Sequence, residues 1–175
     1  MKGYTHIYYG DGKGKTTAAL GLALRACGCG QKVVIVQFLK DWKCGELESL
    51  GKLPNVSVLR GKAEGGVFIS EMSEEQKAET RRIHDENFRQ ALMMQKRGQC
   101  DLLILDEVID ALRLGVLDRE MLFMLLNSKP ESLELVLTGH KPNAELLERG
   151  DYVTEMIKRK HPFDSGVAAR RGVEY

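Results

Sequence analysis

A cluster of glycines, lysines and threonines near the start of the chain has the composition of a phosphate-binding loop. Residues 10–17 read Gly-Asp-Gly-Lys-Gly-Lys-Thr-Thr. Glycines let successive backbone N–H groups converge on an anion, and a lysine can reach phosphate oxygens. The hydroxyl after that lysine binds magnesium in such loops, so Lys15 and Thr16 are the residues expected to do chemistry. The first glycine of the pattern G-x-x-x-x-G-K-[ST] falls at Tyr9, so the loop should have its own shape.

Two acidic residues follow an apolar run further along the chain. Residues 102–107 read Leu-Leu-Ile-Leu-Asp-Glu, which is typical of a strand buried on both faces and ending in carboxylates. Alone this signal is weak, because many strands end in an acidic residue. Together with the loop, it predicts a site for ATP and Mg²⁺ in which Thr16, Asp106 and Glu107 bind the metal ion. Lys15, Thr16 and Glu107 are the candidate catalytic residues; the alternative is a glycine-rich turn with a chance lysine.

The elements that must position these residues alternate between strand and helix. Strands are expected at 5–9, 32–39, 55–59, 101–105, 133–137 and 152–157. Helices are expected at 15–26, 73–97, 108–127 with a break at Gly115, and 143–148. The alternation predicts one α/β domain, residues 1–175, built as a three-layer sandwich around a mostly parallel sheet of about six strands. With the phosphate loop, this is the P-loop NTPase-like (RecA-like) fold, and the glycine-bearing segment 40–73 is expected to be a loop over its carboxyl edge.

Composition argues against several classes of partner. A net charge of +1 gives no long-range field for nucleic acid or an anionic membrane. No apolar run has the length of a membrane span, and the N-terminus has no secretory h-region. The four cysteines form no CxxC pair, which favours reduced thiols over a zinc site. We therefore expect a cytoplasmic protein without nucleic-acid or membrane partners.

Several segments resemble, in chain order, the corrinoid adenosyltransferases of the CobA/BtuR/CobO type. They are residues 10–19 (GDGKGKTTAA), 36–40 (VQFLK), 105–107 (LDE), 137–140 (LTGH) and 161–175 (HPFDSGVAARRGVEY). The combination of the GKGKTT loop with the HPF-x₂-G-x₅-G-x-E-Y tail is specific, and the similarity covers nearly the whole chain. These enzymes make adenosylcobalamin from ATP and a reduced corrinoid, acting on cob(I)alamin or cob(I)yrinic acid a,c-diamide.

The resemblance implies a reaction in which Co(I) attacks the 5′ carbon of ATP and the whole triphosphate leaves. Because Co(I) is already a strong nucleophile, the sequence needs no general base. The loop would position ATP and stabilise the departing triphosphate. The resemblance also implies a homodimer and a reduced flavoprotein as electron donor.

Family roles can be carried over to individual residues of this chain. The residues expected to hold the nucleotide are Gly10, Asp11, Gly12, Lys13, Gly14, Lys15, Thr16, Thr17 and Arg25. The tail would close over the nucleoside. Phe68 corresponds to an aromatic residue near the corrin, and Trp42 could act from a neighbouring loop, so both are corrinoid-binding candidates. Residue 140 is histidine where the family usually has arginine, and it is expected to contact nucleotide or phosphate rather than cobalt.

Two other functions remain open at this point. A P-loop small-molecule kinase would transfer only the terminal phosphate of ATP. A non-catalytic regulatory module would bind ATP without chemistry. The sequence shows neither the arginine-rich lid of small nucleotide kinases nor the paired cysteines of zinc-bearing thymidine kinases.

Overall fold

Six strands form one sheet at the centre of the molecule. They are β1 (Thr5–Tyr9), β2 (Val33–Gln37), β3 (Val56–Arg60), β4 (Leu102–Asp106), β5 (Glu134–Thr138) and β6 (Tyr152–Glu155). The order is β3-β2-β4-β5-β1-β6, and every neighbouring pair is parallel. The computed structural model describes residues 2–40, 44–61 and 72–174. The predicted parallel sheet of about six strands is confirmed.

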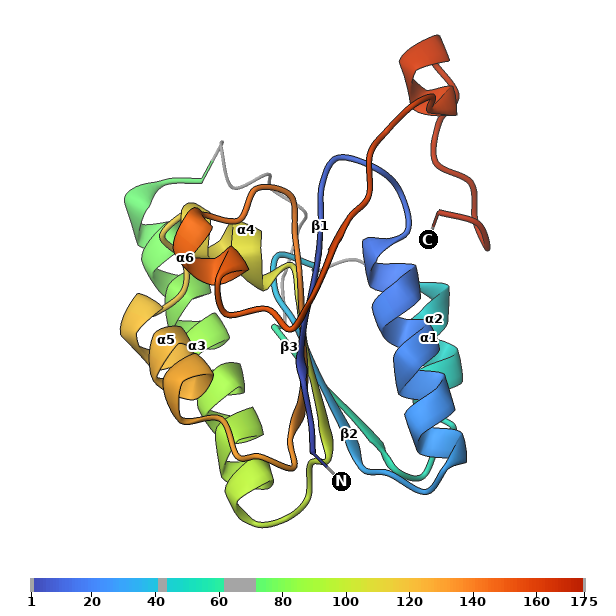
Figure 1. Ribbon diagram of the computed structural model, residues 1–175. Helices are drawn as coiled ribbons and strands as arrows, with labels where there is room; N and C mark the ends of the chain where they lie inside the picture. Colours follow the sequence, from blue (N-terminus) through green and yellow to red (C-terminus); the bar gives the residue numbers. More distant parts are fainter. Residues whose placement is uncertain (1, 41–43, 62–71, 175) are drawn as a thin grey trace.

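Helices cover both faces of this sheet (Figure 1). One layer consists of α1 (Lys15–Gly28) and α2 (Gly45–Leu50). The other consists of α3 (Glu74–Lys96), α4 (Val108–Arg113), α5 (Arg119–Ser128) and α6 (Ala144–Leu147). The three-layer arrangement is therefore as expected. In the part of the chain that the structure describes, no helix has the length and apolar character needed to cross a bilayer.

Two apolar clusters lie on opposite sides of the sheet and explain why the central strands are apolar throughout. In β4, Leu103 and Leu105 belong to the cluster beneath α3–α6, whereas Leu102 and Ile104 belong to the cluster beneath α1. Alternate side chains of a strand point to opposite faces, so a strand covered on both sides needs apolar residues at every position. All five residues of β4 are buried, which places Asp106 in the core at the end of the strand.

Helix boundaries follow local chemistry. Ser73 caps α3 through a capping box with Gln76. The break predicted at Gly115, which has φ 73°, separates α4 from α5, and the side chain of Asp118 caps α5. Helix α2 lies in the segment expected to be a loop. It has six residues and one buried side chain, Leu50, so the helix is too short for a helical period to be visible in the sequence.

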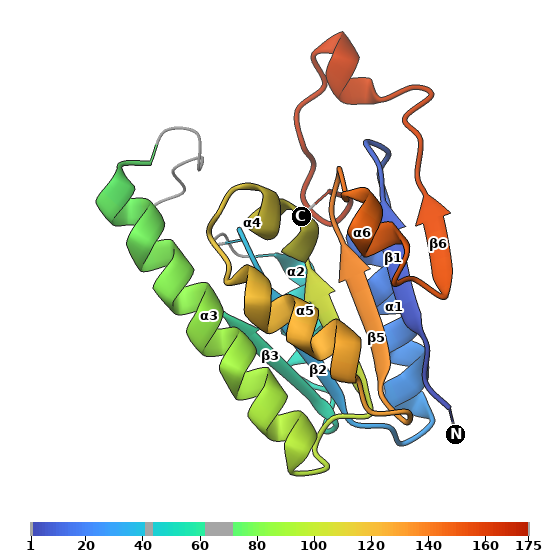
Figure 2. The same cartoon turned by 60° about the vertical axis from the view of Figure 1, so that its left-hand side comes forward.

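The chain leaves the sheet over the carboxyl ends of the strands. Strand β6 ends at Glu155, two residues earlier than expected, because its last partner on β1 is Tyr9, and the glycine-rich loop follows. The chain then runs to a short 3₁₀ turn, Pro162–Ser165, above the carboxyl edge (Figure 2). The loop after β1 and the C-terminal segment therefore lie together at this edge.

Candidate active site

The glycine-rich loop and the acidic pair meet at the carboxyl edge of the sheet. Strand β1 leads into the loop, strand β4 ends in Asp106, and β5 lies between them. Parallel strands present their carboxyl ends at one edge, where ligands of open α/β sheets bind. The Thr16 hydroxyl donates a hydrogen bond to Asp106 Oδ1 at 2.9 Å. The structure thus brings together two segments that are 90 residues apart.

Glycine is required in the loop by both backbone angle and space. Gly10 has φ 111° and Gly14, which precedes α1, has φ 114°. A Cβ on Gly10 would lie 2.4 Å from the Met156 carbonyl oxygen, closer than atoms can approach. The N–H of Gly10 donates to the His140 carbonyl at 3.1 Å, and that of Gly12 donates to the Met156 carbonyl at 2.7 Å. The loop is therefore held between the chain that follows β5 and the chain that follows β6.

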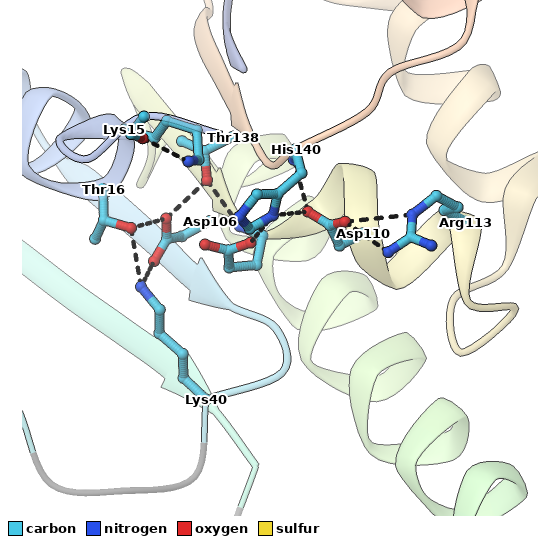
Figure 3. Close-up of polar contacts among 10 residues, drawn as sticks. Lys15, Thr16, Lys40, Asp106, Asp110, Arg113, Thr138 and His140 are labelled. Atoms are coloured by element: carbon cyan, nitrogen blue, oxygen red, sulfur yellow. Dashed lines mark hydrogen bonds and ion pairs between the residues drawn. The ribbon is translucent and has the colours of Figure 1, made fainter. Parts of the chain in front are cut away.

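Lys15 and Thr16 begin α1 and turn toward the sheet edge (Figure 3). Lys15 is 7% exposed, and its amine donates to the Gly12 carbonyl at 2.9 Å. This contact folds the lysine back over the loop, where its charge faces the backbone that would surround a phosphate. Thr16 instead faces Asp106.

Asp106 is the centre of the polar network (Figure 3). It is 0% exposed, and its Oδ1 accepts hydrogen bonds from the hydroxyls of Thr16 and Thr138 at 2.9 and 2.8 Å. Its Oδ2 pairs with the Lys40 amine at 2.6 Å, and the same amine donates to Thr16 at 2.9 Å. A fully buried carboxylate is stable only with such partners, so the four side chains stabilise one another.

Lys40 is a site residue that the sequence did not identify as one. It follows β2, the strand next to β4, and the Phe38 N–H donates to the Asp106 carbonyl at 2.9 Å. Leu39 has φ 59°, an uncommon angle for a residue with a branched side chain. This left-handed residue directly precedes the lysine that turns into the network. The one available signal was the position of Lys40 at the end of the VQFLK segment.

The left-handed turn at Leu39 is held by a buried histidine. The Leu39 N–H donates to His84 Nε2 at 3.3 Å, and His84 Nδ1 lies 2.8 Å from the Val116 carbonyl. A carbonyl only accepts, so Nδ1 carries the proton and His84 is neutral in this arrangement. Burial lowers the pKa of His84, which favours the same neutral form.

Glu107 begins α4 in a left-handed conformation, with φ 63°. Its N–H donates to the Thr138 hydroxyl at 2.8 Å, and its carboxylate lies 3.9 Å from His140 Nδ1. Burial and the nearby charge of Asp106 raise the pKa of Glu107. Glu107 thus lies beside the Thr16–Asp106 pair, and its buried carboxylate is unfavourable in the ionised form unless a cation or hydrogen-bond donor compensates the charge.

Asp110 fixes His140 on the far side of Glu107. One Asp110 oxygen accepts from the His140 N–H at 2.7 Å and from its Nδ1 at 2.9 Å, and the other accepts from Arg113 at 3.0 Å. Burial alone would raise the pKa of Asp110, but these hydrogen bonds outweigh burial and lower it. The bond to Asp110 raises the pKa of His140 against the effect of burial. Both shifts favour the ionised pair.

The donor atoms at this edge suit a hard divalent cation. Thr16, Asp106 and Glu107 offer hydroxyl and carboxylate oxygens, which are the ligands that magnesium prefers. Donor atoms of Glu107, Asp110 and His140 also lie within 4.8 Å of one another. The Lys40 amine bridges Thr16 and Asp106, so a cation bound directly to those two oxygens would displace it.

Two charged loop residues contact the C-terminal segment instead of the network. The Asp11 carboxylate accepts from the Lys158 N–H at 3.0 Å, which lowers the pKa of Asp11. The Lys13 amine pairs with Glu174 at 3.0 Å. The C-terminal segment is therefore joined to the loop by specific contacts.

The remaining predicted residues are dispersed. Thr17 is exposed in the first turn of α1. Arg25 is exposed in the last turn of α1, and ten residues of helix place it about 15 Å from Lys15 along the axis. The structure does not bring Arg25 to the loop. Trp42 and Phe68 lie outside the described residues.

Comparison with known proteins identifies the family. A family model described as ATP:corrinoid adenosyltransferase BtuR/CobO/CobP matches residues 1–175. The corrinoid adenosyltransferase of Escherichia coli K12 is 34% identical, with 99% of this chain and 86% of that protein covered. The corrinoid adenosyltransferase CobA of Salmonella typhimurium is 32% identical with the same coverage.

A solved structure shares the fold. The KaiC-like protein of Pyrococcus horikoshii has a TM-score of 0.53 and 18% identity, covering 91% of this chain and 75% of that chain. This likeness confirms the predicted α/β fold, a parallel sheet with helices on both faces. The match along the whole sequence adds what the fold alone does not: the chain belongs to the ATP:corrinoid adenosyltransferase family.

Proposed function

We propose that this protein transfers the 5′-deoxyadenosyl group of ATP to the Co(I) centre of a reduced corrinoid and releases triphosphate, in adenosylcobalamin synthesis or salvage. One observation carries the proposal. In a chain of this family, the phosphate loop and the acidic end of β4 lie at one sheet edge and are joined by the 2.9 Å hydrogen bond from Thr16 to Asp106. A nucleotide's polyphosphate and a divalent ion can therefore be bound side by side.

The transfer step needs no proton movement. The cobalt electron pair forms the Co–C bond to the 5′ carbon, the C5′–O bond breaks, and triphosphate leaves with the electron pair of the broken C5′–O bond. Negative charge on the bridging oxygen grows in the transition state, so the protein accelerates the step by neutralising it.

Each loop residue has a proposed task in this step. Lys15 and the backbone of residues 10–14 hold the triphosphate, and Thr17, Asp11 and Lys13 line the loop. Thr16, Asp106 and Glu107 hold Mg²⁺, which when bound neutralises charge on the leaving group. Displacement of the Lys40 amine from Thr16 and Asp106 would free it to approach phosphate.

Other parts of the proposal rest on the sequence and on family resemblance. We propose that residues 1–175 act as one domain, that the protein works in the cytoplasm as a homodimer, and that a reduced flavoprotein supplies electrons. Phe68 and Trp42 are proposed to contact the corrinoid.

Product analysis separates this reaction from its alternatives. The protein is incubated anaerobically with ATP, Mg²⁺ and chemically reduced cobalamin. Adenosyl transfer yields the Co–C absorption band and one triphosphate per alkylated cobalt. ADP without alkylcobalamin would favour a kinase, and ATP binding with neither product would favour a regulatory module. The Lys15→Ala variant is the control for background alkylation.

A further inference from the structure

A cavity of about 360 Å³ lies next to the candidate active site, on the sheet face covered by α3–α6. It is lined by Arg81, Ile109, Leu112, Arg113, Gly115, Leu117, Arg119, Lys141, Asn143 and Leu146. Its volume is within the range of small-molecule sites, roughly 300–1,000 Å³. Ile109 is two residues beyond Glu107 and packs against Gly139, and Lys141 directly follows His140. The cavity therefore adjoins the carboxyl edge where the nucleotide site lies.

The cavity combines an apolar floor with a basic rim. Leu112 is half-buried and presents apolar surface, whereas the other apolar side chains of the lining, Ile109, Leu117 and Leu146, are almost wholly buried. Four of the lining side chains are cationic and none is acidic; the cations are Arg81, Arg113, Arg119 and Lys141. Such a lining suits a ligand with an apolar body and an attached anion.

Carboxylates outside the lining balance three of these cations. Arg113 pairs with Asp110, and Arg119 with Glu145. Arg81 lies 3.7 Å from Asp85 and 3.9 Å from Asp118. Lys141, in contrast, makes no hydrogen bond or ion pair with the residues that the structure describes. It is the rim cation with a charge still available to a ligand.

We propose that this cavity binds the phosphate-linked aromatic base of a complete corrinoid when the base is not bound to cobalt. The proposal rests on the adenosyl-transfer function. A Co(I) centre that attacks ATP without a lower ligand must release its base, and the base remains tethered to the corrin through a phosphodiester. The apolar floor offers a surface for the flat base, and Lys141 with the rim arginines offers cations for the phosphate. A carboxylate on the corrin rim would use the cations but leave the floor empty.

The test compares cobalamin, which carries the phosphate and base, with cobinamide, which carries neither. KM and kcat for adenosylation of both are measured for the wild type, Lys141→Glu, Lys141→Arg and Lys96→Glu. Lys96 is exposed near the end of α3, at the opposite edge of the sheet, and controls for charge reversal. Lys141→Glu should raise the KM for cobalamin about tenfold, because the exposed side chain then repels the phosphate instead of attracting it. The KM for cobinamide, the KM for ATP and kcat should stay within about twofold, and Lys141→Arg should retain the wild-type KM for cobalamin.

The result that overturns the proposal is equally direct. If Lys141→Glu changes the KM for cobalamin and for cobinamide equally, or changes neither, the cavity does not bind the base. An effect confined to a corrinoid with free carboxylates, tested with cobyrinic acid a,c-diamide, would also refute a phosphate-linked base as occupant. Turnover of cobinamide by the wild type separates the cavity proposal from the proposed function. If cobinamide is adenosylated, a negative result with Lys141→Glu refutes the cavity proposal alone. If neither cobinamide nor cobalamin reacts, the adenosyl-transfer function itself is wrong.

Discussion

Replacing Lys40 by methionine tests whether the network around Asp106 is formed as described. The change removes the amine 2.6 Å from Asp106 Oδ2 and keeps an unbranched side chain that can lie along the same path. Asp106 is 0% exposed and the Lys40 side chain is 13% exposed, so neither charge is well solvated. The variant leaves a buried carboxylate with hydroxyl donors but without a cation.

The expected cost follows from the distance and the burial. At an effective dielectric constant of about 20, two unit charges 2.6 Å apart attract by ~6 kcal/mol. Desolvation of the amine cancels roughly half of this gain. Asp106 keeps its hydrogen bonds to the hydroxyls of Thr16 and Thr138 in both proteins, so these bonds do not enter the difference. We expect Lys40→Met to lower the free energy of unfolding by about 3 kcal/mol.

Urea unfolding at pH 7 without nucleotide measures this free energy, with the double variant Lys40→Met/Asp106→Asn as the matched control. The double variant should recover about 2 kcal/mol, because no uncompensated charge remains. Mg²⁺ at ten times its dissociation constant should restore about 1.4 kcal/mol to Lys40→Met by taking the position of the amine. A loss below about 1 kcal/mol, or a double variant no more stable than the single one, would refute the buried ion pair.

Three further predictions concern the loop and its support. Lys15→Ala should reduce adenosyl transfer at least about 100-fold, measured by the Co–C absorption band, with the circular dichroism spectrum unchanged. Gly10→Ala should weaken ATP binding in calorimetry and lower the free energy of unfolding in urea by about 2 kcal/mol or more, because Gly10 has φ 111° and a Cβ there would collide with Met156. The control is Gly21→Ala, at an exposed helical position with free space, which should instead stabilise α1. The pKa of His84 is lower in the folded state than in the unfolded state, so the unfolded state binds more protons. The contribution of neutral His84 to the free energy of unfolding is therefore complete above the unfolded pKa of about 6.5 and is lost as the pH falls below that value. Urea midpoints from pH 7.5 to 5 should show this fall, and His84→Gln should flatten it; an unchanged slope would contradict a neutral His84.

The sequence could predict what short segments determine by themselves. The loop at 10–17 and the apolar run ending in Asp106 carry their own signatures, and strand–helix alternation implies that both end at one edge. Lys40 and Thr138 could not be assigned in this way, because their roles depend on β2 and β5 flanking β4. That order is set by packing across the whole chain. The turn at Leu39 adds a second obstacle, since its left-handed φ depends on His84, which is 45 residues away in the sequence.

The pairing of Asp110 with His140 was hidden for the same reason. The two residues stand on α4 and after β5, and neither has a local pattern that joins them. The short helix α2 had too few apolar positions to be distinguished from a loop. Trp42 and Phe68, assigned to the corrinoid by resemblance, remain predictions.

The strand order also has a consequence for synthesis on the ribosome. Among the described strands, β1 pairs with β5 and β6, so Thr5–Tyr9 has no neighbour in the described sheet until residues beyond 134 have emerged. By then β2, β3 and β4 can already have paired with one another. The nascent loop therefore stays without its flanking backbone contacts until translation is nearly complete, because those contacts come from His140 and Met156. Nucleotide binding by nascent chains should begin abruptly after β6 has left the exit tunnel.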